Sequence, residues 1–595
     1  MQHLYQEYDQ FLTHDTERLS EAKKSIRKLA FLRLSAFSGI ILSLIFLPKI
    51  SPLLAWGSAL LLLILFFYGI KSFVLKEKEK KFYTCLIQIN EDEQLALDEI
   101  FEQFDNGAEY TDPDHPYSFD LDLFGVGSLF QYLNRTTTAG GKRKLAAFLN
   151  YLFLDPDIIE LRQKAILELS ENTRWRQYFA AKGPGGHDQQ LRFIEQSGNL
   201  MKLENPNSLK WIFTVFPSIS ILLLILCIFS VLPWAAFMLS GSVNLLILYT
   251  QHKKIDSFYQ LFGNQTEILE NYLELFRLAE QKQFHTELLK RIQESLCVEG
   301  KPASYAIAGL KQIMSRFEYR SNIIFILTGE FIFLWDLVCI YKLNLWRQKH
   351  QDHIAGWFEA IYELDALSSL ANFDHNHPEW ALPFFERTDF CFSANDLAHP
   401  LIKPAKRIGN DFRMNGEGKI VIITGANMAG KSTFLRTIGV NMILATNGCR
   451  VCAAWMTMKP VNLFTNMRTT DNLRKEESYF FAELQRLQQM LSLLLTGQPL
   501  FIIIDEMLKG TNSKDKLSGS KALIEKLIRL NANGVVATHD LNLTELAEIY
   551  PENIINSCFD VHLSPEKLIF DYKLRDGITH TMNASFLMKK MGIID

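Results

Sequence analysis

Two pairs of long apolar runs stand out in the N-terminal half of the chain. Residues 51–70 carry no charge and consist mainly of Leu, Ile and Phe, and another apolar run covers 34–47. The run at 51–70 is long enough to cross ~30 Å of hydrocarbon as a helix. The run at 34–47 reaches that length if it starts near residue 30 and Arg33 extends toward the membrane interface. Pro48 and Pro52 predict a turn, so residues 30–70 are predicted to form a transmembrane hairpin.

A second pair follows at 211–250, where Pro233 divides an uncharged stretch into two shorter runs. Lys and Arg residues flank both pairs, and the positive-inside rule places those flanks in the cytoplasm. The pattern predicts four membrane spans in two hairpins and a multi-pass protein of the cell (cytoplasmic) membrane; the alternative is a helix buried in a soluble core. A fifth run at 323–341 contains Glu330 and Asp336, each costly at the centre of a bilayer, so it is interpreted as a buried soluble helix.

The pattern changes in the C-terminal third. Short runs rich in β-branched residues at 420–424, 500–504 and 534–538 are bounded by turn residues, and a helical pattern follows the first of them. Continuous apolar strands that alternate with helices are typical of a parallel sheet buried on both faces. Residues 255–296 and 304–346 instead show charged and apolar residues at helical spacing. The sequence predicts a multidomain α + α/β chain with a helical core and a C-terminal α/β domain.

The loop after the first of these strands carries the clearest chemistry, because residues 425–432 fit the phosphate-loop pattern G-x-x-x-x-G-K-[ST]. Its glycines allow backbone N–H groups and the start of the next helix to face a phosphate. Lys431 is expected to reach the β- and γ-phosphates of ATP, and the Ser432 hydroxyl to bind Mg²⁺. The predicted nucleotide-binding residues of this loop are Gly425, Ala426, Asn427, Met428, Ala429, Gly430, Lys431, Ser432 and Thr433.

The other two strands end in residues that suit phosphate chemistry. Asp505 and Glu506 follow the strand at 500–504, where an aspartate can hold Mg²⁺ through water and a glutamate can orient or deprotonate the attacking water. His539 follows the strand at 534–538 and can donate a hydrogen bond to the γ-phosphate as a sensor. The competing interpretation is that these side chains only cap their strands. We predict Glu506, His539 and Lys431 as catalytic residues and Ser432 and Asp505 as metal ligands.

Composition adds little to this picture. The net charge of −4 gives no electrostatic sign of a dedicated DNA-binding protein, although a local basic patch is compatible with it. The eight cysteines are scattered without the spacing of a disulfide framework, as expected for reduced thiols in the cytosol. Cys449 and Cys452 form one C-x-x-C, but no second pair exists to complete a metal site, so we interpret them as structural.

Five segments in the C-terminal third, at 424–439, 471–473, 478–483, 502–515 and 537–540, resemble in order and spacing the ATPase domain of the MutS family of mismatch-repair proteins. This resemblance covers about residues 395–595. It implies an ABC-type P-loop ATPase in which two subunits meet head to tail and Ser478 contacts the neighbour's nucleotide. The family usually has Pro and Gly where Ala426 and Ala429 stand, and charged residues precede Ser478 here. Ser478 is equally suited to be the N-cap of the helix that follows.

The segments 120–131, 133–136 and 161–165 resemble the opening of the helical core of the same family, whereas the first hundred residues do not resemble its mismatch-reading domain. The spans are therefore expected to replace part or all of the DNA clamp. The predicted domains are a cytoplasmic N-terminal segment (1–29), transmembrane hairpin 1 (30–70), linker helices (71–115), the first part of the core (116–210), transmembrane hairpin 2 (211–250), the second part of the core (251–370), a lead-in (371–410) and the ATPase domain (411–595).

The resulting hypothesis is a membrane-anchored, MutS-type ATPase. It would bind ATP and Mg²⁺ in a composite site of a homodimer and drive a conformational change. The resemblance implies DNA, mismatched or branched, as the target. The alternative is an ATP-driven membrane-remodelling or transport-like protein with no DNA role. The missing mismatch reader weakens repair, and the scarcity of polar residues in the predicted spans weakens transport.

Overall fold

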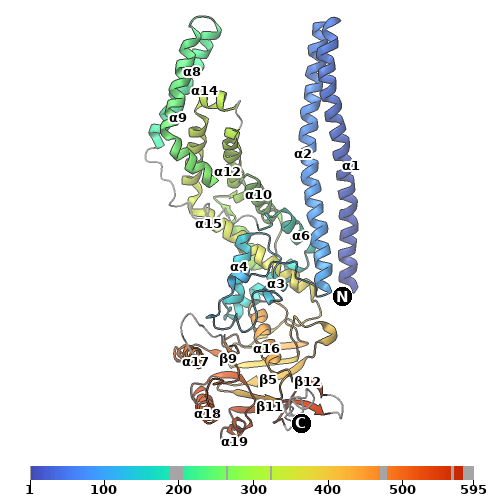
Figure 1. The fold of residues 1–595 in the computed structure, drawn as a ribbon, viewed down its shortest axis with the longest axis vertical. Coiled ribbons are helices and arrows are strands. Elements are labelled where there is room, and N and C mark those ends of the chain that lie inside the picture. Colours follow the sequence, from blue (N-terminus) through green and yellow to red (C-terminus); the bar gives the residue numbers. More distant parts are fainter. Residues whose placement is uncertain are drawn as a thin grey trace. The chain divides into compact units, whose positions relative to one another are not determined.

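The structure is a computed structural model that describes residues 2–186, 206–262, 266–321, 325–468, 479–563 and 568–579. Contacts divide the chain into two compact units. The first contains Met1–Arg135, Leu145–Thr173 and Ser368–Asp595, and the second contains Thr136–Lys144 and Arg174–Leu367. The described residues are mostly helical, and the two larger sheets belong to the first unit (Figure 1). The predicted combination of α and α/β structure is thus confirmed.

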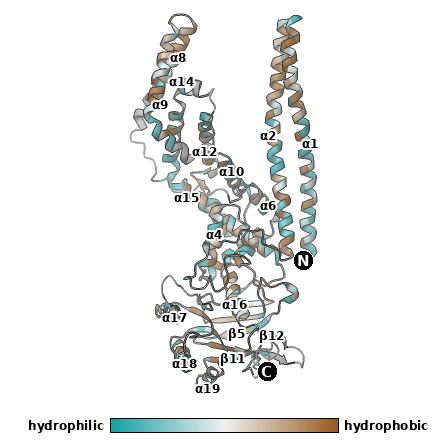
Figure 2. Ribbon diagram, viewed as in Figure 1, coloured by the Kyte–Doolittle hydropathy of each residue, from teal (hydrophilic) through white to brown (hydrophobic). Residues whose placement is uncertain are grey.

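The first unit begins with a helical hairpin made of α1 (Gln2–Phe46) and α2 (Pro52–Leu97), joined by the turn η1 (Leu47–Lys49). Small residues let the helices approach closely near the turn, since the Ser43 hydroxyl donates to the Ala55 carbonyl at 3.2 Å. The part next to the turn is strongly apolar (Figure 2). By length and composition alone, both helices suffice to cross a membrane, and both extend beyond the predicted hairpin at 30–70.

The second unit contains the pair predicted as the other transmembrane hairpin, which forms α8 (Pro206–Ile228) and α9 (Trp234–Phe262). Within the described residues neither helix has the length and hydropathy of a span, and the apolar part of α8 is the shorter stretch Thr214–Ile228. The prediction of four membrane spans is therefore not supported. The other elements assigned wholly or largely to this unit are α6 (Thr173–Lys182), α10 (Thr266–Gln281), α11 (Glu287–Ser295), β1 (Cys297–Val298), β2 (Lys301–Pro302), α12 (Ala303–Phe317) and η4 (Glu318–Ser321).

A polar contact shows how α9 is packed. Asn244 is 1% exposed, and its side-chain amide donates to the Ser220 hydroxyl at 3.0 Å and to the Phe331 carbonyl at 2.8 Å. Asparagine lowers the hydropathy of α9, and here its amide is held by protein groups. Hydropathy read along a sequence does not distinguish a helix that faces lipid from one that packs against other helices.

The run at 323–341 is not the single helix that was predicted. Its described part contains the π-helical turn η5 (Ile326–Glu330), α14 (Phe331–Phe333) and the start of α15 (Trp335–Asn376), which continues into the first unit. Leu334 breaks the helix with a φ of 51°. Glu330 and Asp336 are both buried, as predicted, and the Asp336 N–H donates to the Glu330 carboxylate across the break at 3.2 Å.

The C-terminal part of the first unit is built on two sheets. The larger has the order β12-β11-β6-β10-β9-β8, with β12 antiparallel to β11 and the other neighbours parallel. Its strands are β6 (Ile420–Gly425), β8 (Asn462–Asn466), β9 (Leu500–Asp505), β10 (Asn533–Thr538), β11 (Ile554–Leu563) and β12 (Leu568–Asp576). The smaller has the order β3-β7-β4-β5, made of Phe384–Phe385, Trp455–Met458, Cys391–Leu397 and Asn410–Asn415.

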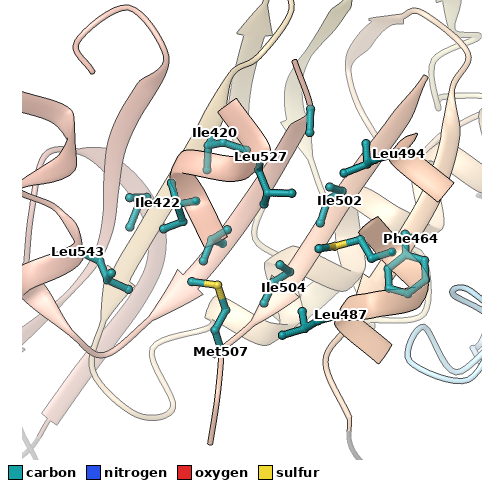
Figure 3. Packing of buried hydrophobic residues seen from close by; sticks show 14 of the residues in the cluster. Ile420, Ile422, Phe464, Leu487, Leu494, Ile502, Ile504, Met507, Leu527 and Leu543 are labelled. Carbon is teal, nitrogen blue, oxygen red and sulfur yellow. The ribbon is translucent and has the colours of Figure 1, made fainter. Parts of the chain in front are cut away.

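Helices cover both faces of the larger sheet. On one face, α17 (Tyr479–Leu495) and α18 (Ser513–Arg529) pack on the strands through a cluster that includes Leu487, Leu527 and Ile502 (Figure 3). On the other, α16 (Lys431–Thr446) is close enough that a Cβ on Gly439 would lie 3.4 Å from Ile503. This alternation explains why β9 is apolar throughout. The remaining helices that lie wholly or partly in this unit are η2 (Ala108–Tyr110), α3 (Leu129–Leu133), α4 (Ala139–Asn150), α5 (Pro156–Ser170), η6 (Pro404–Lys406), η7 (Leu541–Leu543) and α19 (Leu546–Ile549).

Candidate nucleotide-binding site

Three neighbouring parallel strands bring the predicted site together. In the sheet, Thr424 of β6 is opposite Thr538 of β10, and Ala537 of β10 is opposite Asp505 of β9. The carboxyl ends of the three strands therefore meet at one edge, which is where open α/β sheets bind ligands. A cavity of about 450 Å³ lies at this edge. It is lined by Ala426, Asn427, Met428, Ala429, Gly430, Lys431, Ser432, Thr433, Asp505, Glu506, Lys509, His539 and Tyr572.

The predicted phosphate loop runs from the end of β6 to the start of α16. Gly430 is the N-cap of α16 and has a φ of 105°, a left-handed conformation that glycine adopts without strain. A Cβ at this position would lie 3.1 Å from the ring of Tyr572, which shows how closely the loop approaches β12. The first amides of α16 have no carbonyl partner within the helix, so this end of the helix suits an anion.

Lys431 is held inside the loop. Its ammonium donates to the carbonyl oxygens of Gly425 at 2.8 Å and Ala426 at 3.0 Å, and only 6% of the residue is exposed. Burial lowers the pKa of Lys431 to about 8, against an opposing effect of the nearby Asp505 and Glu506 carboxylates. A partly buried cation held by neutral carbonyls is well placed to exchange them for an incoming phosphate, whose charge would favour the ammonium form.

Ser432 and Asp505 meet across the site. The Ser432 hydroxyl donates to the Asp505 carboxylate at 2.5 Å, although the two residues are 73 positions apart in the chain. One hydroxyl and one carboxylate at this separation offer oxygen ligands of the kind that Mg²⁺ prefers, with room left for waters and phosphate oxygens. The structure thus brings together the two residues predicted as metal ligands.

Glu506 and His539 form the other side of the cavity. The His539 Nε2 atom is 3.8 Å from the Glu506 carboxylate and 3.4 Å from the Lys431 ammonium. Burial, followed by the charge of Lys431, lowers the pKa of His539, so the ring is neutral near pH 7. Glu506 has a φ of 61° and a backbone N–H that donates to the Ala537 carbonyl at 2.9 Å. The carboxylate therefore extends from a strained but hydrogen-bonded turn.

Nearly all predicted site residues line one cavity or its rim. Gly425 ends β6 directly before the lining residues, and Ser478 lies outside the described residues. Sequence reasoning missed Lys509 and Tyr572 as lining residues. Tyr572 comes from β12, an edge strand 140 residues after the loop, and Lys509 comes from the turn after β9. No local pattern marks either one, but the position of Lys509 close behind Asp505 is a signal that could have found it.

The donor set fits a magnesium–nucleotide complex on three observations. A cavity of about 450 Å³ is open at the strand ends. The start of α16, capped by Gly430, faces this cavity. The hydroxyl–carboxylate pair of Ser432 and Asp505 lies beside Lys431, whose described hydrogen bonds are to two carbonyl oxygens and to His539. If Mg²⁺ binds here, Ser432 and Asp505 would hold it, and its charge would be shared with the phosphate oxygens.

Comparison with known proteins agrees with this geometry. Residues 421–589 match the family model of MutS domain V. The DNA mismatch repair protein MutS of Thermotoga maritima is 31% identical over 252 residues, which are 42% of this chain and 31% of that protein. The DNA mismatch repair protein MSH4 of Arabidopsis thaliana is 34% identical over 32% of this chain and 24% of its own length. MutS protein homolog 4 of Homo sapiens is 32% identical over 39% of this chain and 25% of its own length.

These matches cover less than a third of each relative, so they describe a shared domain and leave the remaining parts of the proteins uncompared. The family match begins in β6 and includes the phosphate loop, β9, β10 and their strand-end residues. The comparisons therefore show that the C-terminal part of this chain is similar to MutS domain V.

Proposed function

We propose that this chain is an ATPase of the MutS type that is anchored to a membrane. The main support for ATPase activity is the 2.5 Å hydrogen bond from the Ser432 hydroxyl to the Asp505 carboxylate. Lys431, Glu506 and His539 lie in the same cavity. Three separate strand ends supply these groups to one cavity, which a chance match to a phosphate-loop pattern would not require.

In this proposal each side chain has a distinct task. Lys431 leaves the carbonyls of the loop and binds the β- and γ-phosphates, while the amides at the start of α16 hold the β-phosphate. Glu506 orients a water molecule and accepts its proton as that water attacks the γ-phosphorus, while the bond from the γ-phosphorus to the β–γ bridging oxygen breaks and ADP leaves. His539 donates a hydrogen bond to a γ-phosphate oxygen and so distinguishes ATP from ADP. If Mg²⁺ is bound, Ser432 and Asp505 would hold it, and its charge would offset the negative charge of the phosphate oxygens.

The direct test is hydrolysis of Mg·ATP by the full chain purified in detergent. Lys431→Ala should weaken ATP binding and abolish turnover because it removes the phosphate-binding cation. The matched control is Lys521→Ala, since Lys521 forms an exposed ion pair with Glu545 and lies outside the cavity. Equal hydrolysis by the wild type and Lys431→Ala would contradict the proposal.

Membrane anchoring is proposed for the α1/α2 hairpin. Its apolar part exposes many large side chains, including Leu53 and Trp56, and a monomeric soluble protein rarely leaves so large an apolar surface bare. Below it, the basic residues of the two helices lie at the same level, because Arg33 of α1 contacts Gly69 and lies over the Phe73 ring of α2. The cations of this collar are Lys23, Lys24, Arg27, Lys28, Arg33, Lys71, Lys76, Lys78, Lys80 and Lys81, and two of them form ion pairs within α2, Lys76 with Glu79 and Lys80 with Glu77. An apolar tip above a basic collar suits a bilayer with anionic headgroups.

Hydrogen bonds and ion pairs within the first unit join the base of this hairpin to the ATPase domain. Tyr8 of α1 donates to Asn376 at 2.7 Å, and Asn376 donates to Glu93 of α2 at 2.9 Å. Two residues earlier, Asp374 pairs with Arg450 at 3.2 Å, just beyond the end of α16. A movement of α16 on nucleotide binding would thus reach the hairpin through the end of α15.

The target of this movement is proposed to be DNA, bound by a homodimer of the chain, because the relatives that match the ATPase domain are named as DNA mismatch repair proteins. The second candidate is membrane remodelling without DNA, which the apolar hairpin favours. Duplex binding by the detergent-purified protein, measured with matched and mismatched DNA at several salt concentrations, separates them. Binding at low salt supports the DNA role, and its absence supports the second candidate.

A further inference from the structure

Glu483 of α17 is a buried carboxylate with no role so far. It is 1% exposed and accepts hydrogen bonds from two consecutive backbone amides, Leu508 N–H at 2.5 Å and Lys509 N–H at 2.9 Å. Each carboxylate oxygen thus holds one amide. These amides belong to the turn that follows β9, three and four residues after Asp505.

The backbone of this turn is in a strained conformation that other contacts must stabilise. Glu506 and Leu508 have φ values of 61° and 55°, and the left-handed region is strained for a non-glycine residue. Such a conformation persists only where the surroundings impose it. The Met507 and Leu508 side chains are buried in the cluster under α17 and α18, which fixes one side of the turn. The Glu483 carboxylate holds two backbone amides of the same turn.

A second contact ties the same helix to the same turn. A Cβ on Gly510 would lie 2.8 Å from the Cβ of Phe480, so α17 approaches the turn without space for a side chain. Phe480 and Glu483 are three residues apart and lie on one face of the helix. The start of α17 is therefore packed directly against the turn at 506–510.

We propose that Glu483 is a positioning residue that holds the turn 506–510 so that Glu506 and Lys509 face the nucleotide cavity. The inference rests on the proposed ATPase function, in which Glu506 needs a fixed position to activate water. Glu483 does not touch the cavity itself. Its effect on catalysis passes through the backbone amides of Leu508 and Lys509.

The test compares Glu483→Gln and Glu483→Ala with the wild type. Glutamine keeps one acceptor oxygen and alanine keeps none, so kcat should fall in the order wild type, Gln, Ala, with a loss of ~10–100-fold for a misplaced catalytic group. The Kd for ATP should change less than about twofold, because the phosphate loop is untouched. Leu487→Ala is the matched control: it weakens the packing of the same helix, which should lower Tm while kcat stays near that of the wild type.

Hydrogen–deuterium exchange supplies a readout that does not depend on hydrolysis. In Glu483→Gln, the amides of 508 and 509 should exchange faster, while those of 420–424 stay protected. Unchanged exchange at 508 and 509, or a loss of kcat in Leu487→Ala as large as that in the Glu483 variants, would overturn the proposal. A wild type that shows no hydrolysis would contradict the ATPase function instead, and the exchange experiment would still decide the role of Glu483.

Discussion

The hydroxyl of Ser432 donates a hydrogen bond to the carboxylate of Asp505 at 2.5 Å, and this contact joins the helix after the phosphate loop to the end of β9. Each residue alone has an ordinary explanation, as a helix residue or as the end of a strand. Their contact places a hydroxyl and a carboxylate where a magnesium ion on bound ATP would lie.

Substitution of Ser432 should therefore change the dependence on Mg²⁺. Ser432→Ala removes a predicted ligand and should raise the Mg²⁺ concentration needed for half-maximal hydrolysis by ~10–100-fold. Ser432→Thr keeps the hydroxyl, which the phosphate-loop pattern allows, and should remain near the wild type. A magnesium titration of steady-state hydrolysis checks both. Identical curves for the Ala and Thr variants would exclude a role for the hydroxyl.

The lowered pKa of Lys431 predicts proton uptake on ATP binding. Burial lowers this pKa to about 8, so the side chain of the free protein is mostly neutral at pH 9, whereas bound phosphates would keep it charged. ATP binding should then take up a proton at pH 9 and almost none from this group at pH 7, and Kd should rise with pH above 8. Calorimetry in buffers with different ionisation enthalpies measures the uptake. Lys431→Arg, which is always charged, should lack it.

An ion pair at the base of the α1/α2 hairpin is expected to contribute to the free energy of unfolding. Arg135 pairs with the buried carboxylate of Glu93 at 2.5 Å. Burial raises the pKa of Glu93, but the charge and hydrogen bonds of Arg135 and neighbouring side-chain amides lower it below its usual value. This contribution to stability is present above the unfolded pKa and is lost as the pH falls. Arg135→Ala leaves the carboxylate unpaired and should cost about 3–5 kcal/mol at pH 7, measured by thermal or denaturant unfolding.

The matched control for Arg135 is Arg18→Ala. Arg18 pairs with Glu21 at 3.4 Å on an exposed helix face, and such surface pairs contribute about 0–1 kcal/mol. Equal losses of unfolding free energy in the two variants would show that the Glu93–Arg135 pair stabilises the first unit no more than a surface pair does.

The anchoring proposal predicts that the apolar tip of α1/α2 is necessary for membrane association. Because Arg33 contacts Gly69, a short Gly-Ser linker can join residues 29 and 71 in place of 30–70 and leave the base of the hairpin intact. This variant should appear in the soluble fraction after cell lysis and retain ATP hydrolysis. The same linker in place of 229–233 should leave the protein in membranes. Retention of the first variant in membranes would move the anchor to α8 and α9.

The local chemistry of the site could be predicted from the sequence because it depends on short segments. The loop at 425–432 and the carboxylates after β9 are each read from a strand and its next few residues, and the sheet register then brings them together. Tyr572 and Glu483 could not be predicted in this way. Their roles depend on an edge strand and a helix that reach the site through long-range packing.

The helical elements were predicted less well from the sequence. Hydropathy predicted membrane spans for both α1/α2 and α8/α9, but among the described residues only α1 and α2 have the length and hydropathy of a span. The break at Leu334 was also missed, because an apolar run carries no signal for a left-handed leucine.

The proposed function requires Glu506 as the base of ATP hydrolysis, and steady-state hydrolysis measured in parallel with ATP binding separates this role from nucleotide binding. Glu506→Gln should bind Mg·ATP with near wild-type affinity and lose ~100-fold or more in kcat, because the amide cannot accept the proton of the attacking water. Glu545→Gln, an exposed substitution outside the cavity, should match the wild type. Unchanged hydrolysis by Glu506→Gln would show that Glu506 is not the catalytic base.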